Sequence, residues 1–446
     1  MPTTPNSAPE RRAPLYPRLP PGRNTMSRAH VAAHQRARLR GAAVAVLEHK
    51  SAADVTVADL ISLAGVSRRA FYEHFDSKQA CLLGSYEDVL ADAAGRVMAA
   101  YSRESEPLAG MRAAYEAFVG ELVEHPTAAR VVFLDVLALG RAAVERGESL
   151  RLAFESKMRE DGSLLAGLSL HPTVLTGVLA GAWQLARRRL LQDRVADLLD
   201  LRCELLAWVG SYSSPAVDSL RVGAVKPILD PRAPTAPPRE QDPHKRILRA
   251  TARLATRDGY RELSPAAIIE AAEVSYEDFF ERFQTAEECF LGALELLAAE
   301  ALANAWRAVR TAEDWVGAVI FAIRAFFDQL VREPSFAPLA FIEAFALGEP
   351  ALRLREQLLR SVEALYIRHA TDPHAPSPLV AEAVVGAIWG LVHDKALRGE
   401  ADRLPDLSEH AAYIVLAPIL SAERAVKRII AARPAATSHN DDPVRQ

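Results

Sequence analysis

Apolar residues recur at three- and four-residue spacing along most of the chain. The stretches 36–48 and 246–257 show this period clearly, and it places apolar side chains on one face of an α-helix. Runs of alternating β-branched residues, which would indicate strands, are nearly absent. Short segments of Gly, Pro and Ser/Thr interrupt the helical pattern. We therefore predict an all-α protein with roughly eight to ten helices in each half.

The chain repeats itself at an offset of 208 residues. The match runs without a gap for about 120 positions, and it places Cys81 on Cys289. After a shift of two residues, Trp183 falls on Trp389. A match that extends so far beyond a short motif indicates a tandem duplication of one helical unit.

Proline-rich segments lie outside the helical pattern. Residues 1–28 contain seven prolines, and the first 40 residues carry eight arginines against one acidic residue, Glu10. This composition predicts a disordered basic arm. A second proline cluster lies within 221–243, between two periodic regions, and predicts an extended linker.

Residues 56–78 have the pattern of a short helix, a glycine turn and a second short helix. Thr56 and Ser67 are placed to cap the two helices, and Gly65 can take the left-handed conformation that a sharp turn needs. Phe71 and Phe75 are four residues apart and can anchor the second helix to the core. The other faces of that helix then carry cationic and polar side chains, as in a recognition helix that enters the major groove of DNA.

This segment, with its Ala-Gly-Val-Ser turn and its Phe-Tyr-x-His-Phe-x-Ser-Lys ending, resembles the N-terminal DNA-binding region of the TetR family of bacterial transcriptional regulators. The resemblance covers about residues 30–90, and a degraded copy covers about 240–298. It implies that residues at two helix starts and on the recognition helix contact DNA phosphates. It also implies that arginines of the recognition helix contact base edges. The implied DNA-binding residues are Thr56, Ser67, Arg68, Arg69, Tyr72, His74 and Lys78.

Each of these residues also has a structural interpretation. Arg68 and Arg69, which the resemblance assigns to base edges, could be solvated surface cations. Tyr72 and His74, which it assigns to phosphates, could be partly packed. The position of the two arginines at the start of the second helix favours DNA contact.

The second copy of the motif carries acids where the first carries cations. Glu277 and Asp278 take the place of the Arg68–Arg69 pair, and Ala286 replaces Lys78. The matched windows 36–80 and 244–288 have net charges of +2 and −2. Acids opposite phosphates weaken the contact that supplies most DNA affinity. We predict a retained structural module, and the alternative is a reader of unusual specificity in which Glu277 contacts cytosine.

The two later helical blocks resemble the ligand-binding and dimerisation domain of the same family in length and helicity. That resemblance implies a pocket for a small effector in each block and a pair of long helices that packs against a partner. Residues 173–191 and 379–397 contain small side chains that permit close helix approach. We therefore predict that the two halves pack on each other as an intramolecular pseudo-dimer.

Four residues in these blocks are candidates for effector contact. Asp135 and Glu343 are acids within apolar runs, and Trp183 and Trp389 are aromatic residues at matched positions. A buried carboxylate is more often paired internally, and a tryptophan more often belongs to the core. The structural interpretation is therefore favoured for all four, and the effector is not identified by the sequence.

Composition excludes several classes of protein. The net charge of −4 over 446 residues excludes a global polyanion-binding or membrane-binding character. Three widely spaced cysteines support neither a disulfide framework nor a cysteine-ligated metal site. The sequence has no enzyme motif, so we predict no catalytic residues, no cofactor and no metal. We expect a cytoplasmic protein without a membrane span.

These observations predict a sequence-specific DNA-binding transcriptional regulator, and most simply a repressor controlled by a small molecule. With one competent reader per chain, a palindromic operator requires two chains, so a homodimer on double-stranded DNA is expected. The alternative is a non-enzymatic interaction scaffold or adaptor that has largely lost DNA binding. The expected domains are a disordered basic arm (1–28), a helix-turn-helix DNA-binding domain (29–90), a helical ligand-binding and dimerisation domain (91–220), a Pro-rich linker (221–243), a degenerate helix-turn-helix domain (244–298), a second helical ligand-binding and dimerisation domain (299–432) and a disordered tail (433–446).

Overall fold

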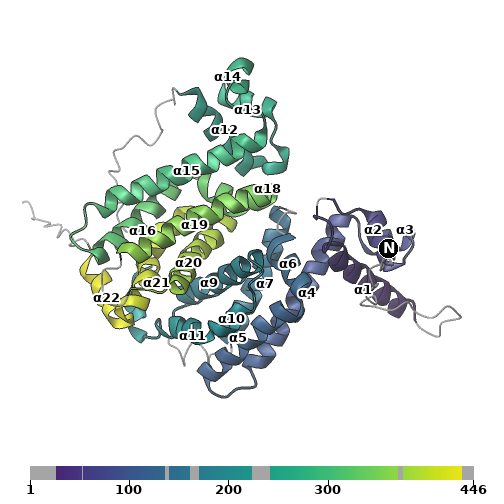
Figure 1. The fold of residues 1–446 in the computed structure, drawn as a ribbon, viewed down its shortest axis with the longest axis horizontal. Coiled ribbons are helices and arrows are strands. Elements are labelled where there is room, and N and C mark those ends of the chain that lie inside the picture. The colour runs from purple at the N-terminus through teal and green to yellow at the C-terminus, as the bar shows by residue number, and fades with distance from the viewer. Residues whose placement is uncertain are drawn as a thin grey trace, which may run out of the picture. The chain divides into compact units, whose positions relative to one another are not determined.

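The described part of the chain is helical throughout. The computed structural model describes residues 27–52, 54–135, 140–160, 170–222, 242–369 and 375–433, and these ranges contain helices and turns but no strand (Figure 1). The all-α prediction is therefore confirmed. The arm up to residue 26, the linker from 223 to 241 and the tail from 434 lie outside the described ranges. The chain divides into two compact units, residues 1–96 with 120–150 and residues 97–119 with 151–446.

The first unit contains the intact helix-turn-helix. Its helices are α1 (Arg28–Val46), α2 (Val57–Ala64), α3 (Arg68–His74), α6 (Pro126–Arg130) and the π-helical turn η1 (Val131–Asp135). The helices α4 (Lys78–Tyr101), α5 (Pro107–Glu124) and α7 (Arg141–Glu160) are shared with the second unit along the sequence.

One fully buried side chain from each helix builds the core that holds α1 to α4 together. Leu39, Leu60, Phe71 and Cys81 each have no exposed surface. Burial of a side chain the size of leucine or phenylalanine stabilises the folded state by ~1.5–3 kcal/mol. This core fixes the short helices α2 and α3, which are too short to be stable alone in water.

The second unit contains the rest of the described helices. They are α9 (Pro172–Leu191), α10 (Asp197–Asp200), α11 (Arg202–Gly210), η3 (Pro215–Ser219), α12 (Pro243–Asp258), η4 (Tyr260–Glu262), α13 (Pro265–Ala272), α14 (Tyr276–Phe280), α15 (Ala286–Val309), α16 (Trp315–Arg332), α17 (Phe336–Pro338), η5 (Leu339–Glu343), α18 (Ala344–Leu347), α19 (Glu349–His369), α20 (Pro378–Leu397), η6 (Ala401–Leu407), α21 (Ser408–Leu420) and α22 (Ala422–Ala431).

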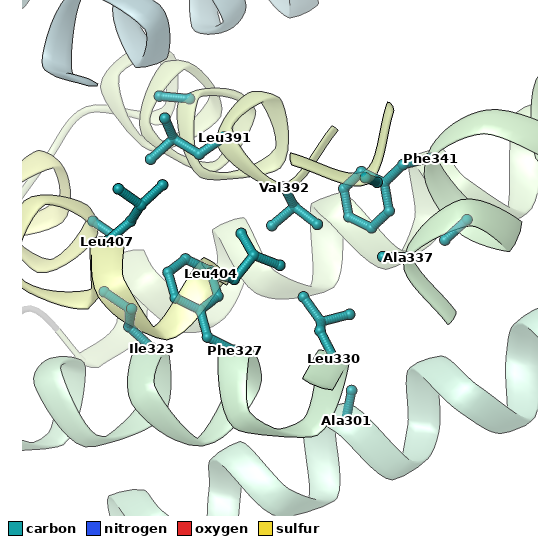
Figure 2. Close-up of a cluster of buried hydrophobic side chains, with 14 of the residues drawn as sticks. Ala301, Ile323, Phe327, Leu330, Ala337, Phe341, Leu391, Val392, Leu404 and Leu407 are labelled. Carbon is teal, nitrogen blue, oxygen red and sulfur yellow. The ribbon is translucent and has the colours of Figure 1, made fainter. Parts of the chain in front are cut away.

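A cluster of buried apolar side chains between α16, η6 and α20 forms part of the core of this unit. Phe327 and Leu330 are fully buried on α16 and face Leu404 of η6 and Val392 of α20 (Figure 2). The apolar residues of α16 recur at three- and four-residue spacing, so one face of the helix enters the cluster. The apolar positions that recur with the helical period in the sequence are thus the positions that pack into this cluster.

The helix bounds repeat along the chain with the offset found in the sequence. At 208 residues, α2 matches α13, α4 matches α15 and α5 matches α16 at both ends. The π-helical turns η1 and η5 match at the same offset, and α9 matches α20 at 206. Two stretches of the chain therefore follow the same order of helices.

The helices α9 and α20 pack directly against each other within the second unit (Figure 1). A Cβ atom built at Gly181 would lie 2.5 Å from the carbonyl oxygen of Ala383, and one at Gly390 would lie 2.0 Å from the Cβ of Ala180. Both distances are far inside van der Waals contact. The absence of a side chain at the two glycines is therefore what permits this approach.

Helix α15 is the one described helix that is long and apolar enough to cross a membrane. Its buried residues include Cys289, Phe290, Ala293, Leu294 and Leu297, which follow the helical period, and it packs against α12 and α16. Glutamates lie on the rest of its surface. These features are typical of a core helix with one solvated side.

Candidate nucleic-acid interface

The first helix of the motif starts at a complete capping box. The hydroxyl of Thr56 accepts a hydrogen bond from the backbone N–H of Asp59 at 3.2 Å, and the carboxylate of Asp59 accepts one from the backbone N–H of Thr56 at 2.9 Å. The two bonds satisfy N–H groups that α2 leaves without a helical partner. The predicted capping role of Thr56 is confirmed, and its hydroxyl also donates to Asp59 at 2.7 Å.

Two lysines tie this cap to the rest of the unit. The ammonium of Lys50 lies 2.7 Å from Asp59, and the ammonium of Lys78 donates to the carbonyl oxygen of Val55 at 2.7 Å. Hydrogen bonds from Lys50 and Thr56 lower the pKa of the Asp59 carboxyl to about 2. Lys78, the first residue of α4, thereby holds the start of α4 against the start of α2.

The Asp59 contacts predict a weakening of the first unit in acid. Because the pKa falls from 3.8 to about 2 on folding, the contribution of the charged carboxylate is complete above pH 4 and is lost as the pH falls toward 2. We expect the urea midpoint of wild type to exceed that of Asp59→Asn most clearly at pH 5 and the gap to close by pH 2. A gap that stays constant across this range would contradict the assignment.

A left-handed glycine separates the two helices of the motif. Gly65 has φ 60° and ψ 41°, which glycine adopts without the steric cost that a Cβ adds. Two residues later, the hydroxyl of Ser67 accepts from the backbone N–H of Ala70 at 3.1 Å and caps α3. The predicted roles of both residues in the turn and the cap are confirmed.

Aromatic residues anchor α3 on its inner side. Phe71 is fully buried and Phe75 is 5% exposed. The guanidinium of Arg36 lies over the Phe75 ring at 5.2 Å, and the Nε2 of His74 lies 3.1 Å from the Oε1 of Gln35 on α1. The inner face and one flank of α3 are therefore held against α1.

The outer face of α3 presents the predicted contact residues to solvent. Arg68, Arg69 and Tyr72 are exposed, and the Tyr72 side chain is 52% exposed although it touches Phe71 edge-on. Arg69 forms an ion pair with Glu73, one helical turn later, at 2.9 Å. Such an exposed pair contributes little to the stability of the fold. Arg68 makes no ion pair with any described residue. A cationic and aromatic face of this kind can contact phosphates and base edges.

The seven predicted residues thus divide into two groups. Thr56, Ser67, Arg68, Arg69 and Tyr72 are exposed on α3 or at the helix starts. His74 and Lys78 are half-buried and already contact protein groups, Gln35 and the Val55 carbonyl. The sequence did not predict either partner. A histidine or a lysine gives no sign by itself of a contact with a residue 39 or 23 positions away.

The second motif has the same backbone plan with different surface chemistry. Ser275 caps α14 by accepting from the N–H of Asp278 at 3.0 Å, as Ser67 caps α3. Because the two serines are equivalent, Tyr276 corresponds to Arg68 and Glu277 to Arg69. The predicted replacement of the arginine pair by Glu277 and Asp278 is therefore wrong by one position, since Asp278 corresponds to Ala70.

Helix α14 carries no basic residue, and the nearby Arg282 is already paired within the described part of the chain. Glu273 takes the left-handed turn position, with φ 52°, that Gly65 takes in the first motif. Arg282 folds back and donates to the backbone carbonyl of Asp278 at 2.6 Å. Tyr276 and Phe280 stack on each other at 6.2 Å and are both exposed. An acidic and aromatic helix face does not complement a phosphate backbone.

The four candidates for effector contact are divided between the two units, with Asp135 in the first and the other three in the second. Asp135 ends η1 in the first unit, and its side chain lies outside the described part. Glu343 ends the equivalent turn η5, is buried, and accepts from the N–H of Tyr260 at 3.1 Å. Trp183 is partly buried on α9. Trp389 stacks on Phe341 with ring centroids 3.9 Å apart.

No metal centre is present among the residues that the structure describes, since no three or more His, Cys, Asp or Glu side chains converge there. Cys81 and Cys289 are buried at equivalent positions of α4 and α15, and Cys203 is exposed. Burial raises the pKa of the Cys81 and Cys289 thiols to about 12, so neither thiol is activated as a nucleophile or metal ligand.

Comparison with known proteins places the intact motif in a family. The family described as "Bacterial regulatory proteins, tetR family" matches residues 39–84. The HTH-type transcriptional regulator EthR of Mycolicibacterium smegmatis (strain ATCC 700084 / mc(2)155) is 36% identical over 86 residues, which are 19% of this chain and 40% of that protein. The chain thus matches less than half the length of this curated relative.

Two solved structures show weaker similarity. The fatty acid degradation regulator FadR from Bacillus halodurans matches 40% of this chain and 96% of its own, with 14% identity and a TM-score of 0.37. A TetR-family transcriptional regulator from Syntrophomonas wolfei str. Goettingen matches 44% of this chain and 97% of its own, with 14% identity and a TM-score of 0.29. Residues 39–84 therefore carry the sequence pattern of the tetR family of bacterial regulatory proteins.

Proposed function

We propose that the protein is a sequence-specific DNA-binding transcriptional regulator whose first helix-turn-helix reads the major groove. The observation that carries this proposal is the exposed face of α3, where Arg68, Arg69 and Tyr72 project from a helix that is capped at Ser67 and anchored at Phe71. Arginine is the side chain best suited to read guanine, and a rigid helix positions it. The phosphate contacts would come from the helix starts and from Lys78.

The finer role is that of a repressor controlled by a small-molecule effector and bound to its operator as a homodimer. A palindromic site needs two readers, and α14 offers an acidic face in place of the second reader. The effector would act through its differential affinity for the two arrangements of the DNA-binding regions. The location would be cytoplasmic, where bacterial DNA lies.

We further infer that the chain is a tandem duplication whose halves pair through α9 and α20 as a pseudo-dimer. The repeated helix bounds support the duplication. The close approach at Gly181 and Gly390 supports the pairing, because α9 belongs to the first repeat and α20 to the second.

Charges around the same helices support pairing of unlike halves. Arg188 on α9 binds Glu363 on α19 at 2.8 Å, and Asp394, its counterpart on α20, binds Arg151 on α7 at 2.8 Å. A pair of two second halves would place Asp394 where Arg188 lies, close to Glu363 and the neighbouring Glu356. Like charges in such a partly buried site would oppose that pairing.

Selection of genomic DNA fragments by the purified full-length protein tests the proposed function. We expect one motif to be enriched, with two half-sites related by a twofold axis. If the protein retained all fragments equally at moderate salt, it would bind DNA through phosphate contacts alone, and sequence-specific recognition would be contradicted. Enrichment of nothing would favour the alternative function of an interaction scaffold, for which the exposed Tyr276 and Phe280 of α14 are the supporting observation.

A further inference from the structure

Two buried arginines of the second unit lack a carboxylate partner. Arg187 on α9 is 3% exposed and Arg355 on α19 is 6% exposed. Neither makes an ion pair within the described part of the chain. The next residue on α9, Arg188, is equally buried but pairs with three carboxylates, those of Glu356, Glu363 and Glu382.

Aromatic rings take the place of acids around this pair. The Arg187 guanidinium lies 4.6 Å from the centroid of the Phe345 ring. The Arg355 guanidinium lies 5.5 Å from the same ring and 4.8 Å from the ring of Trp389. Trp389 in turn stacks on Phe341 at 3.9 Å. Arg187 therefore lies against one aromatic ring and Arg355 against two, and such rings attract a cation but do not neutralise it.

Several N–H groups of the pair are left without an acceptor. The Nη2 of Arg187 and the Nε of Arg355 are buried and have no hydrogen-bond partner among the described residues. Among the described residues, Arg355 donates from Nη2 to the Oε1 of Gln184 at 3.1 Å. The neighbouring His393 bonds through Nδ1 to the carbonyl oxygen of Phe341 at 2.8 Å and supplies no negative charge.

The nearest acid does not compensate the two cations. Glu356 lies close enough to influence both arginines, but its carboxylate is bound by Arg188 at 2.6 Å and by Arg360 at 3.0 Å. Desolvation and the charge of Arg355 lower the pKa of Arg187. Burying an unpaired charge is strongly unfavourable, so a fold that keeps two together needs a compensating group.

We propose that Arg187 and Arg355 bind the carboxylate of a small organic acid whose apolar part contacts Trp389, Phe341 and Phe345. The planar donor fork of arginine matches a carboxylate in a bidentate pair, and the free N–H groups supply the donors. The aromatic surroundings favour an organic acid over inorganic phosphate, which has no apolar surface to bury. This inference rests on the proposed effector control and names the chemical class of the effector.

The position of the pair links the site to the pairing of the two repeats. Arg187 lies on α9 of the first repeat, whereas Arg355 and Trp389 lie on α19 and α20 of the second. A carboxylate between the two arginines removes the repulsion between like charges that α9 and α19 bring together. The ligand would thus strengthen the contact between the repeats.

Thermal unfolding of the full-length protein with defined probes tests this inference. Benzoate and octanoate are compared with the neutral amides benzamide and octanamide, and with inorganic phosphate. We expect at least one carboxylate to raise Tm saturably and its amide and phosphate to leave Tm unchanged. Equal effects of acid and amide, an effect of phosphate alone, or no effect of either carboxylate would each overturn the proposal.

Variants separate binding from a structural role. Arg187→Met and Arg355→Gln are expected to weaken carboxylate binding at least tenfold, whereas Arg353→Gln, on the exposed side of α19, leaves it unchanged. Arg187→Met is also expected to raise the Tm of the ligand-free protein, because it removes an unpaired buried charge. Wild-type binding by both Arg187→Met and Arg355→Gln would contradict the assignment.

The outcome is independent of DNA binding. Operator affinity is measured beside the probe titrations on the same wild-type preparation. Probe binding without any DNA selectivity would overturn the proposed function and leave the carboxylate site standing. DNA selectivity without carboxylate binding would overturn the carboxylate site alone.

Discussion

Replacing Arg68 and Arg69 with alanine is expected to lower the affinity for the selected operator by ~1–3 kcal/mol per arginine and to leave the affinity for random DNA much less changed. Both side chains project from the outer face of α3, and the Arg69 side chain is 90% exposed, so their loss removes no core contact. The only protein contact given up is the surface pair with Glu73, which contributes little to stability.

Fluorescence anisotropy with the selected fragment and with random DNA, at two salt concentrations, measures this effect. The matched control is Glu277→Ala on α14, where no loss is expected because that acid faces no phosphate in the proposed complex. Lys78→Ala is expected to reduce both affinities alike, partly because it also removes the bond to the Val55 carbonyl. Equal losses on operator and random DNA for the double arginine variant would contradict base reading by α3.

Replacing Gly181 with valine is expected to destabilise the second unit by ~1–3 kcal/mol or more, because a side chain cannot fit between α9 and α20. Even a Cβ at this position would lie 2.5 Å from the carbonyl oxygen of Ala383 and 2.9 Å from the ring of Trp208. Neither the Ala383 backbone nor the buried Trp208 ring can move aside without a large cost in free energy, so the two helices would have to separate. Loss of their contact would also expose Leu175 and Ala387, which are buried on the same helices.

Urea unfolding followed by circular dichroism measures the effect, with Gly210→Ala as the control. Gly210 ends α11 in the same unit, and a Cβ there would meet nothing within 4 Å. A helical glycine with free space gains stability or loses none when it becomes alanine. If Gly181→Val and Gly210→Ala unfolded at the same urea concentration as wild type, close packing of α9 on α20 would be contradicted.

The local geometry of the helix-turn-helix follows directly from the sequence. The caps at Thr56 and Ser67 and the left-handed turn at Gly65 depend on bonds and dihedral angles within three or four residues. Such features are governed by residue type at a given spacing. The anchoring of α3 by Phe71 is similarly predictable, because the helical period distinguishes its buried face from its exposed face.

Side-chain partners across the fold could not be predicted in the same way. The resemblance predicts phosphate contact for His74 and Lys78, but His74 contacts Gln35 on α1 and Lys78 donates to the carbonyl oxygen of Val55, just before α2. The one-position error in the α14 comparison is of another kind, because the 208-residue offset already places Arg68 on Tyr276 and Arg69 on Glu277, and the Ser275 cap agrees with that alignment. The lack of an acid beside Arg187, when Arg188 has three, has no signal in a sequence that contains many arginines.

The sequence by itself determined the helical class, the repeat at 208 residues and the backbone of the DNA-binding motif, because each depends on periodicity or on contacts within one helical turn. Only the tertiary structure decided which helices meet and which charges find partners. The packing of α9 against α19 and α20 brings Arg187 beside Arg355, 168 positions away, and neither arginine has a carboxylate partner among the described residues. Contacts at such separation depend on how whole helices pack, and the free energy of that packing is distributed over many side chains rather than encoded in any one of them.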